Sequence, residues 1–336
     1  QTKLEFYIKG ICLGKNLNCF MIKRNRKNPI KRILRKTENK IVNDKPKIVY
    51  HYDYEHDTGE KVSPEERAYV EKLFIPHRID NESLRIHPKG SRILAEYQDT
   101  KGRKIHRYSQ KEILENVLDK YKRNQLFTKN YQKIVDQLKK DIDVNTKEGQ
   151  AALILYIIYK TGLRIGSETD TKAEQKAYGV STLLNKHVKL LAGNKIKLQF
   201  IGKKGVENST IISDPIIYDA LKKLKGKNWS DKIFNVSDSF ARRYLAEIDN
   251  RFNVKDFRTL KAYTIAKKEI EKRKGPAPDE KTFMKWQKEV ADKVSEKLGN
   301  TRAVALNDYI DPTLWRKWRK KDLPDWMPKK LMKGDL

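Results

Sequence analysis

Cysteines, long apolar runs and motifs for nucleotides or metals are scarce or missing in this chain of 336 residues. Two cysteines, Cys12 and Cys19, are too few for a disulfide framework or a four-thiolate zinc site, so we expect a reducing, intracellular setting. The longest apolar run, residues 151–159, is far shorter than the ~20 residues of a bilayer span, and no signal-peptide pattern opens the chain. The motifs G-x-x-x-x-G-K-[ST], G-x-G-x-x-G and H-E-x-x-H are absent, so the sequence gives no ground for an ATP- or zinc-driven enzyme, and we expect no cofactor and no metal.

Positive charge is what the chain has in excess. Lys and Arg number 74 against 44 Asp and Glu, which gives a formal charge of +30 and a pI of about 9.8. Such an excess destabilises a compact chain through self-repulsion unless a polyanion neutralises it. Nucleic acid is therefore the expected partner.

The pattern along the chain predicts an α+β protein. Residues 1–46 carry 13 Lys and Arg against three acids and are interpreted as a basic N-terminal arm. Residues 47–109 alternate short β-rich runs with turns, around a helix that opens at Ser63, and predict a small β-rich domain. Residues 110–336 predict a mainly helical domain with an inserted β-hairpin near 195–212 and a basic tail, in which Trp315, Trp318 and Trp326 suit either DNA contact or packing. Helices are expected near residues 110–122, 126–142, 147–161, 214–225, 237–250, 256–273 and 279–298.

Four segments could carry phosphoryl transfer by side chains alone, which needs a nucleophile, cations for the non-bridging oxygens and a proton donor. Arg164 follows a buried helix, Lys203 lies at the hairpin tip, Arg258 lies near a helix start, and Tyr309 follows the segment 298–301. Taken singly, each has a simpler interpretation: a helix-capping arginine, a solvated lysine, a first-turn arginine and a core tyrosine. The ordered set is much more specific than any of its members.

This set resembles the small type IB DNA topoisomerases of poxviruses and bacteria, from about residue 70 to 312. The similar segments are Ile75-Pro76 and residues 102–108, 178–188, 200–203, 255–259 and 298–301. The resemblance implies a β-rich N-terminal domain and a catalytic domain of the tyrosine recombinase and type IB topoisomerase kind, forming a clamp around duplex DNA. It also implies relaxation of supercoils without ATP or metal, through transient cleavage of one strand, a 3′-phosphotyrosyl intermediate, strand rotation and religation.

The resemblance also assigns catalytic roles. Tyr309 matches the nucleophile, and Arg164 and Arg258 match the arginines that hold the non-bridging phosphate oxygens. Lys203 matches the general acid for the 5′-oxygen, with Lys204 as its adjacent competitor. Asn300 stands where poxvirus relatives have His, and we expect it to donate to the phosphate; the alternative is an N-cap for a helix from Thr301 to Tyr309.

Further residues are expected to contact DNA. Residues 102–108 resemble the β-domain signature of the family, but Ile105 and His106 stand where poxvirus enzymes carry polar and aromatic contact residues. A poxvirus-like target sequence is therefore in doubt. The expected DNA-binding residues are Lys101, Arg103, Lys104, His106, Tyr108, Ser167 and Lys204.

Two other functions compete with this interpretation. Tyrosine recombinases use the same Arg, Lys, Arg and Tyr, but typically have His three residues before the second arginine, where this chain has Lys255, and a helical N-terminal domain. A non-enzymatic DNA-packaging protein would explain the charge but leaves the ordered set to coincidence. We expect a monomer that acts on double-stranded DNA wherever its genome lies, in a viral particle, at a replication site or in a bacterial cytoplasm, with no membrane association.

Overall fold

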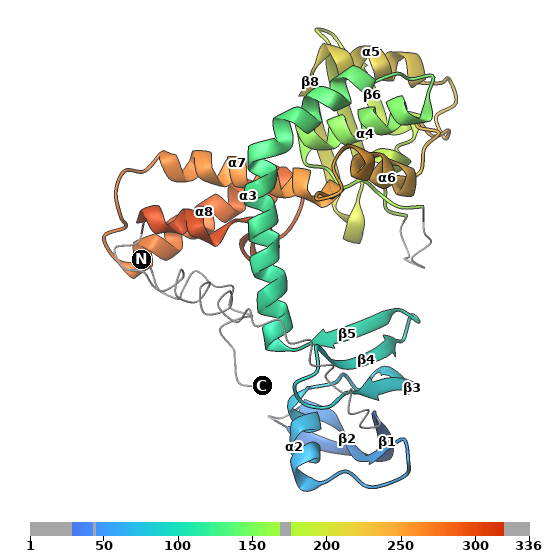
Figure 1. Ribbon diagram of the computed structural model, residues 1–336, viewed down its shortest axis with the longest axis vertical. Coiled ribbons are helices and arrows are strands. Elements are labelled where there is room, and N and C mark those ends of the chain that lie inside the picture. Colours follow the sequence, from blue (N-terminus) through green and yellow to red (C-terminus); the bar gives the residue numbers. More distant parts are fainter. Residues whose placement is uncertain (1–28, 43–44, 169–175, 319–336) are drawn as a thin grey trace, which may run out of the picture. The chain divides into compact units, whose positions relative to one another are not determined.

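The structure is a computed structural model and describes residues 29–42, 45–168 and 176–318. The chain divides into two compact units, Gln1–Ser109 (unit 1) and Gln110–Leu336 (unit 2), which are described separately (Figure 1). Unit 1 is mostly sheet and unit 2 mostly helix, which confirms the expected α+β class. Within the described ranges, no helix combines the length and the apolar composition that a bilayer crossing requires.

In its described residues, unit 1 is an antiparallel five-stranded sheet with one helix. The strands lie in the order β2-β1-β3-β4-β5. As predicted, the helix begins after Ser63, whose hydroxyl accepts from the amide of Glu66 at 3.2 Å while the Glu66 carboxylate accepts from the amide of Ser63 at 2.9 Å. The hydrophobic core of unit 1 includes Val70, Leu73 and Leu84. The elements are β1 (Ile30–Val42), β2 (Lys45–His56), α2 (Pro64–Lys72), β3 (Ile79–Ile86), β4 (Ile93–Asp99) and β5 (Lys104–Tyr108).

The predicted basic arm over residues 1–46 is wrong in its extent. Residues 30–42 form β1, an inner strand of the sheet, and β2 begins at Lys45. Arg32 is buried, and its guanidinium donates to the carbonyls of Ile75 (3.2 Å) and Pro76 (2.8 Å), so part of the apparent surface charge belongs to the interior. Residues 1–28 lie outside the described residues.

Deleting residues 1–46 would remove an inner strand, so it would unfold unit 1 rather than only weaken DNA binding.

Unit 2 is a helical domain with an antiparallel sheet of order β6-β7-β8. The two helices expected at 110–122 and 126–142 are one helix of 32 residues, because no glycine or proline interrupts it. The other expected helices are confirmed within two residues at each end. The elements are α3 (Gln110–Asp141), α4 (Lys147–Thr161), β6 (Val188–Leu191), β7 (Lys195–Ile201), β8 (Glu207–Ser213), α5 (Pro215–Leu224), α6 (Asp238–Ile248), α7 (Val254–Glu271) and α8 (Glu280–Leu298).

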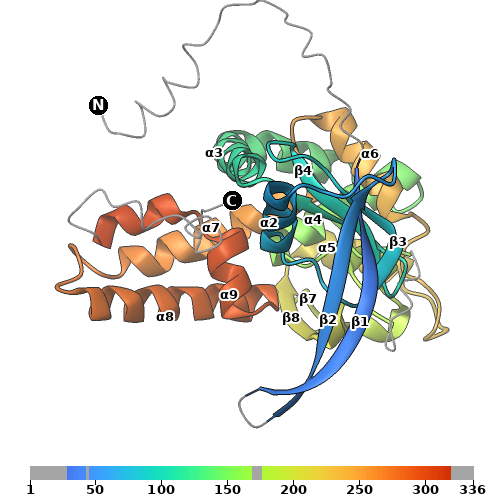
Figure 2. The ribbon, with the colours of Figure 1, turned by 90° about the horizontal axis from the view of Figure 1, so that it is seen from below.

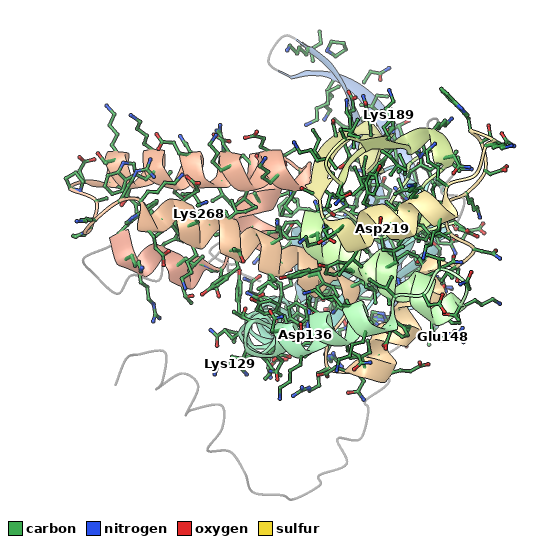
Figure 3. All side chains as sticks on the ribbon, turned by 90° about the horizontal axis from the view of Figure 1, so that it is seen from above. Lys129, Asp136, Glu148, Lys189, Asp219 and Lys268 are labelled. Carbon is green, nitrogen blue, oxygen red and sulfur yellow. The ribbon has the colours of Figure 1, made fainter. Side chains whose placement is uncertain are left out.

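The core of unit 2 has two parts. One surrounds α4, which is apolar on nearly every side and buried along most of its length. The other lies among α7, α8 and the closing turn η5 (Pro312–Trp318) and contains Trp315 and Trp318. Those two tryptophans therefore pack on the domain, whereas Trp326 lies outside the described residues. Charged side chains cover several elements of the unit: the labelled lysines Lys129, Lys189 and Lys268 lie on α3, β6 and α7 (Figure 3).

Candidate active site

Arg164 is placed by the end of α4. The helix ends at Gly162, whose φ of 74° is the left-handed conformation that glycine adopts readily. A Cβ there would lie 2.9 Å from Cδ2 of Leu298, so α8 also approaches this glycine closely. Beyond it, the carbonyl of Arg164 accepts from the amide of Val180 at 2.9 Å, which fixes the backbone. The half-buried guanidinium of Arg164 makes no hydrogen bond to any residue that the structure describes.

Arg258 connects three separate segments. It lies on α7 and is 3% exposed. Its Nε donates to the hydroxyl of Tyr309 at 3.1 Å, Nη1 donates to the carbonyl of Gly162, and Nη2 donates to the carbonyl of Leu298. Burial lowers the pKa of the guanidinium, the charge of Tyr309 opposes that change, and the neighbouring Arg164 lowers the pKa further. Since a guanidinium has five N–H groups, two of them remain for a ligand.

Tyr309 ends a π-helical turn. The expected helix from Thr301 to Tyr309 is instead the short α9 (Arg302–Val304) followed by η4 (Ala305–Tyr309), in which the amide of Ile310 donates to the carbonyl of Ala305 at 2.9 Å. Such turns are rare and are frequently found at functional sites. Tyr309 is 7% exposed, and the charged ends of Lys255 and Arg258 lie 5.6 and 5.2 Å from its ring centre. Its hydroxyl therefore lies among cations.

Asn300 is not the cap of this helix. That role belongs to Thr301, whose hydroxyl accepts from the amide of Val304 at 3.3 Å, so the capping alternative is wrong. Both polar atoms of the Asn300 side chain are buried without a hydrogen-bond partner among the described residues. Unpaired buried amides are rare and costly. The preceding Gly299 has a φ of 56°, and a Cβ there would lie 3.0 Å from Oδ1 of Asn208.

Lys203 lies at the tip between β7 and β8, in the turn η3 (Lys203–Gly205), and its side chain is exposed. Asn208 of β8 donates from Nδ2 to the carbonyl of Val206 at 3.0 Å and also borders Gly299. The hairpin tip therefore adjoins the Asn300 segment. No hydrogen bond or ion pair within the described ranges links Lys203 to the group of Arg164, Arg258 and Tyr309. The side chain of Lys204 lies outside the described part of the structure.

Three lysines that the sequence did not single out as site residues surround this group. Lys255 carries a visible signal, because it lies three residues before Arg258 in the motif. Lys120 of α3 donates from Nζ to the carbonyl of Asp308 at 3.2 Å, and Lys261 of α7 donates to the carbonyl of Lys160 at 3.0 Å. Burial lowers the pKa of both amines. Their acceptors are backbone carbonyls distant in the sequence, so no pattern could reveal them.

Comparisons with known proteins identify the family of the chain. The family model described as eukaryotic DNA topoisomerase I, catalytic core, matches residues 108–321. DNA topoisomerase 1B of Acanthamoeba polyphaga mimivirus is 30% identical over 282 residues, which cover 79% of this chain and 82% of the mimiviral protein. The chain belongs to the type IB DNA topoisomerases. DNA topoisomerase 1 alpha of Arabidopsis thaliana is 33% identical over 121 residues, which cover 35% of this chain and 13% of the plant protein.

Membership in this family decides against the recombinase and packaging interpretations, and it implies that this type IB topoisomerase binds duplex DNA. Within the described residues, no group of three or more His, Cys, Asp and Glu side chains is arranged to hold a metal ion.

In unit 1 of the topoisomerase, the expected DNA-binding residues lie on and before β5. Lys104, His106 and Tyr108 alternate along this edge strand and are all exposed, so they share one face. The rings of His106 and Tyr108 meet edge to face, with centres 6.0 Å apart. This face combines cationic and aromatic groups, as nucleic-acid contacts often do.

The other expected DNA contacts of the topoisomerase are less uniform. Lys101 is exposed in the turn before β5. Arg103 is engaged with Asp99, to which its Nε donates at 2.7 Å, and this bond lowers the pKa of the Asp99 carboxyl to about 2. Ser167 is exposed near the end of the Arg164 loop in unit 2.

We expect Lys120 of the topoisomerase to act as a positioning residue for Tyr309. Lys120→Met keeps most of the stem but removes the bond to the carbonyl of Asp308, so single-turnover cleavage should slow by up to roughly tenfold. DNA affinity should stay unchanged. Lys122→Met, at an exposed position on the same helix, is the matched control. Equal rates for the two variants would contradict this role.

Proposed function

We propose that this topoisomerase relaxes supercoiled duplex DNA through a 3′-phosphotyrosyl intermediate, with neither ATP nor metal. The hydroxyl of Tyr309 attacks a backbone phosphodiester and loses its proton to solvent, a bond forms between the phosphorus and the tyrosine oxygen, and the bond to the 5′-oxygen breaks. The reverse step reseals the strand. The observation that carries the proposal is that Arg258 donates to the Tyr309 hydroxyl while binding the segments that lead to Arg164 and Asn300.

The two arginines are proposed to hold the non-bridging phosphate oxygens. Arg258 keeps two N–H groups after its three protein bonds, and the guanidinium of Arg164 has no protein acceptor in the described residues. A planar guanidinium can bind two phosphate oxygens at once through two parallel N–H groups, whereas a lysine ammonium lacks this bidentate geometry. Fixed positive charge near the phosphate would stabilise the charge that develops during attack.

The unpaired amide of Asn300 supports a third contact. Its Nδ2 is buried and lacks an acceptor among the described residues, so a phosphate oxygen would satisfy it. Lys203 is proposed to protonate the leaving 5′-oxygen. Because the lysine is exposed at the tip of a turn, this role requires the DNA to bring the scissile phosphate to it.

The similar energies of the two esters explain why religation needs no ATP. A phosphodiester is exchanged for a phosphotyrosyl ester of similar energy, and torsion in the DNA drives rotation of the 5′ end before religation. The excess of Lys and Arg would bind the phosphates of the duplex, so the affinity of the protein for DNA should fall as the salt concentration rises. The clamp around duplex DNA and the monomeric state that we expect from the sequence remain parts of this proposal.

Relaxation of a plasmid in EDTA without ATP tests the proposed function. Supercoils of both signs should relax, and a covalent protein–DNA adduct should be trapped under denaturing conditions. Strict dependence on ATP or on a divalent metal would contradict the proposal.

A leaving-group experiment tests Lys203 as the general acid. Lys203→Ala should cleave ordinary DNA ~10²–10⁴-fold more slowly, because proton transfer contributes about that much. On a duplex with a 5′-bridging phosphorothiolate the rate should recover, since a thiolate leaves without a proton. Arg258→Ala is the control, and its defect should persist on the sulfur-containing duplex. Rescue of Lys204→Ala but not of Lys203→Ala would move the assignment to Lys204.

A further inference from the structure

Strands β1 and β2 form a two-stranded ribbon beyond the rest of the sheet. The register joins β1 to β3 only at Ile30 and Ile86, whereas β1 and β2 stay paired as far as Val42 and Lys45. Figure 2 shows these two long strands running on together past the other strands of unit 1. We call residues 34–42 and 45–52 the ribbon. Tyr50 and Tyr52 at its base stack on His77, with ring centres 4.4 and 5.7 Å apart. The far end has only its own two strands, and a two-stranded ribbon by itself is marginally stable in water.

A bulge gathers the ribbon's lysines on one face. Leu34 lies opposite Tyr52 and Lys36 lies opposite His51, so Arg35 is the extra residue. Successive residues on a strand face opposite sides of the sheet, and the extra residue reverses this alternation. Lys36 and Lys40 therefore lie on the face opposite to that of Leu34. The ion pairs of Glu38 with Lys36, with Lys40 (3.3 Å) and with His51 (3.5 Å) confirm that these groups share a face. That lysine face holds Lys36, Lys40, Lys45 and Lys47 against the single acid Glu38.

One pair on the lysine face is costly in the protein alone. Lys40 lies directly opposite Lys47, and like charges at such positions destabilise a sheet. Within the described residues, Lys45 and Lys47 have no ion-pair partner. The arrangement is explained if a polyanion lies against this face, because phosphates would neutralise the opposed lysines.

We propose that the lysine face of the ribbon binds the phosphates of duplex DNA. A two-stranded ribbon is an element that the major groove of B-DNA admits, and duplex DNA is the substrate of the family. The opposite face carries Leu34, Ile41 and Ile48, which are 45%, 80% and 50% exposed and offer nothing to a phosphate. The inference requires DNA binding only, so it is independent of the phosphotyrosyl mechanism.

The test compares the two faces of the ribbon. Lys40→Gln/Lys47→Gln removes the opposed pair, and Ile41→Thr/Ile48→Thr alters the other face. Affinity for a duplex several helical turns long is measured over a range of salt. Each lost phosphate contact lowers the log–log slope by ~0.9, so the lysine variant should lose up to about 1.8, whereas the isoleucine variant should keep the parental slope.

Two further measurements separate this role from a structural one. The lysine variant should unfold at about the same temperature as the parent, because removal of the like-charge pair offsets the loss of the exposed ion pair between Lys40 and Glu38. Its single-turnover cleavage at saturating protein should be unchanged. An unchanged salt slope in the lysine variant would overturn the proposal, as would a loss confined to the isoleucine variant, which would indicate that the DNA contacts the other face. A reduced cleavage rate at saturation would also overturn it.

Discussion

Tyr309→Phe should abolish cleavage while leaving DNA binding intact. The substitution removes the attacking oxygen, and loss of a nucleophile from a working site costs on the order of 10⁶-fold in rate. The fold should survive, because the guanidinium of Arg258 keeps its bonds to the carbonyls of Gly162 and Leu298 and the ring of residue 309 still fills its place in the core. Denaturing gels after incubation with labelled duplex measure the covalent adduct, and a gel-shift measures binding.

Two other tyrosines, the half-buried Tyr263 and the buried Tyr244, provide the controls. Tyr263→Phe, on the same helix as Arg258, should form the adduct at the parental rate. Tyr244 is a poor substitute nucleophile, because its hydroxyl donates to Asp141 at 2.5 Å and burial raises its pKa. An adduct that persists in Tyr309→Phe would show that another residue attacks.

Much of unit 2 could be predicted, since its signals are local. The apolar run of α4 and the glycine that ends it give that helix its bounds, and the order of Arg164, Arg258 and Tyr309 predicts the site. Two of these residues do meet, through the hydrogen bond between Arg258 and Tyr309. The bond from Lys120 to the carbonyl of Asp308 could not be predicted, because a backbone acceptor leaves no mark in the sequence.

Unit 1 was harder for a physical reason. Charged residues fill β1, and the bulge at Arg35 breaks the alternation by which a strand is recognised. Arg32 lies in a stretch as basic as a solvated tail, yet it is buried and its guanidinium donates to two backbone carbonyls. Composition reports charge without its partners, so it predicts a basic arm where the structure has an inner strand.

Substitutions at Asn300 should rank in the order expected for a phosphate donor. Asn300→His should stay active, because an imidazole N–H can replace the amide. Asn300→Ala should slow single-turnover cleavage by ~10²–10³-fold, the usual cost of one charge-stabilising donor. Asn300→Asp should be slowest of all, because it removes the donor and places a negative charge where the phosphate binds. The rates are measured at saturating protein on a single-site duplex.

The neighbouring cap is the control for this series. Thr301→Ala removes the hydroxyl that accepts from the amide of Val304, so it should lower stability by about 1 kcal/mol with a much smaller effect on rate. If Asn300→Asp cleaves as fast as the parent, the phosphate has no contact with residue 300. The buried amide would then require another partner.

Arg258 is a buried cation that forms no ion pair with a carboxylate in the described part of the chain. Its two carbonyl partners lie at the C-terminal ends of α4 and α8. Each helix end carries the equivalent of roughly half a negative charge, so the two macrodipoles together offset about one positive charge. A carboxylate would do the same but would repel the incoming phosphate and compete with it for the guanidinium. Two helix ends compensate the cation without such a competitor, and the arginine can remain charged, buried and available to DNA.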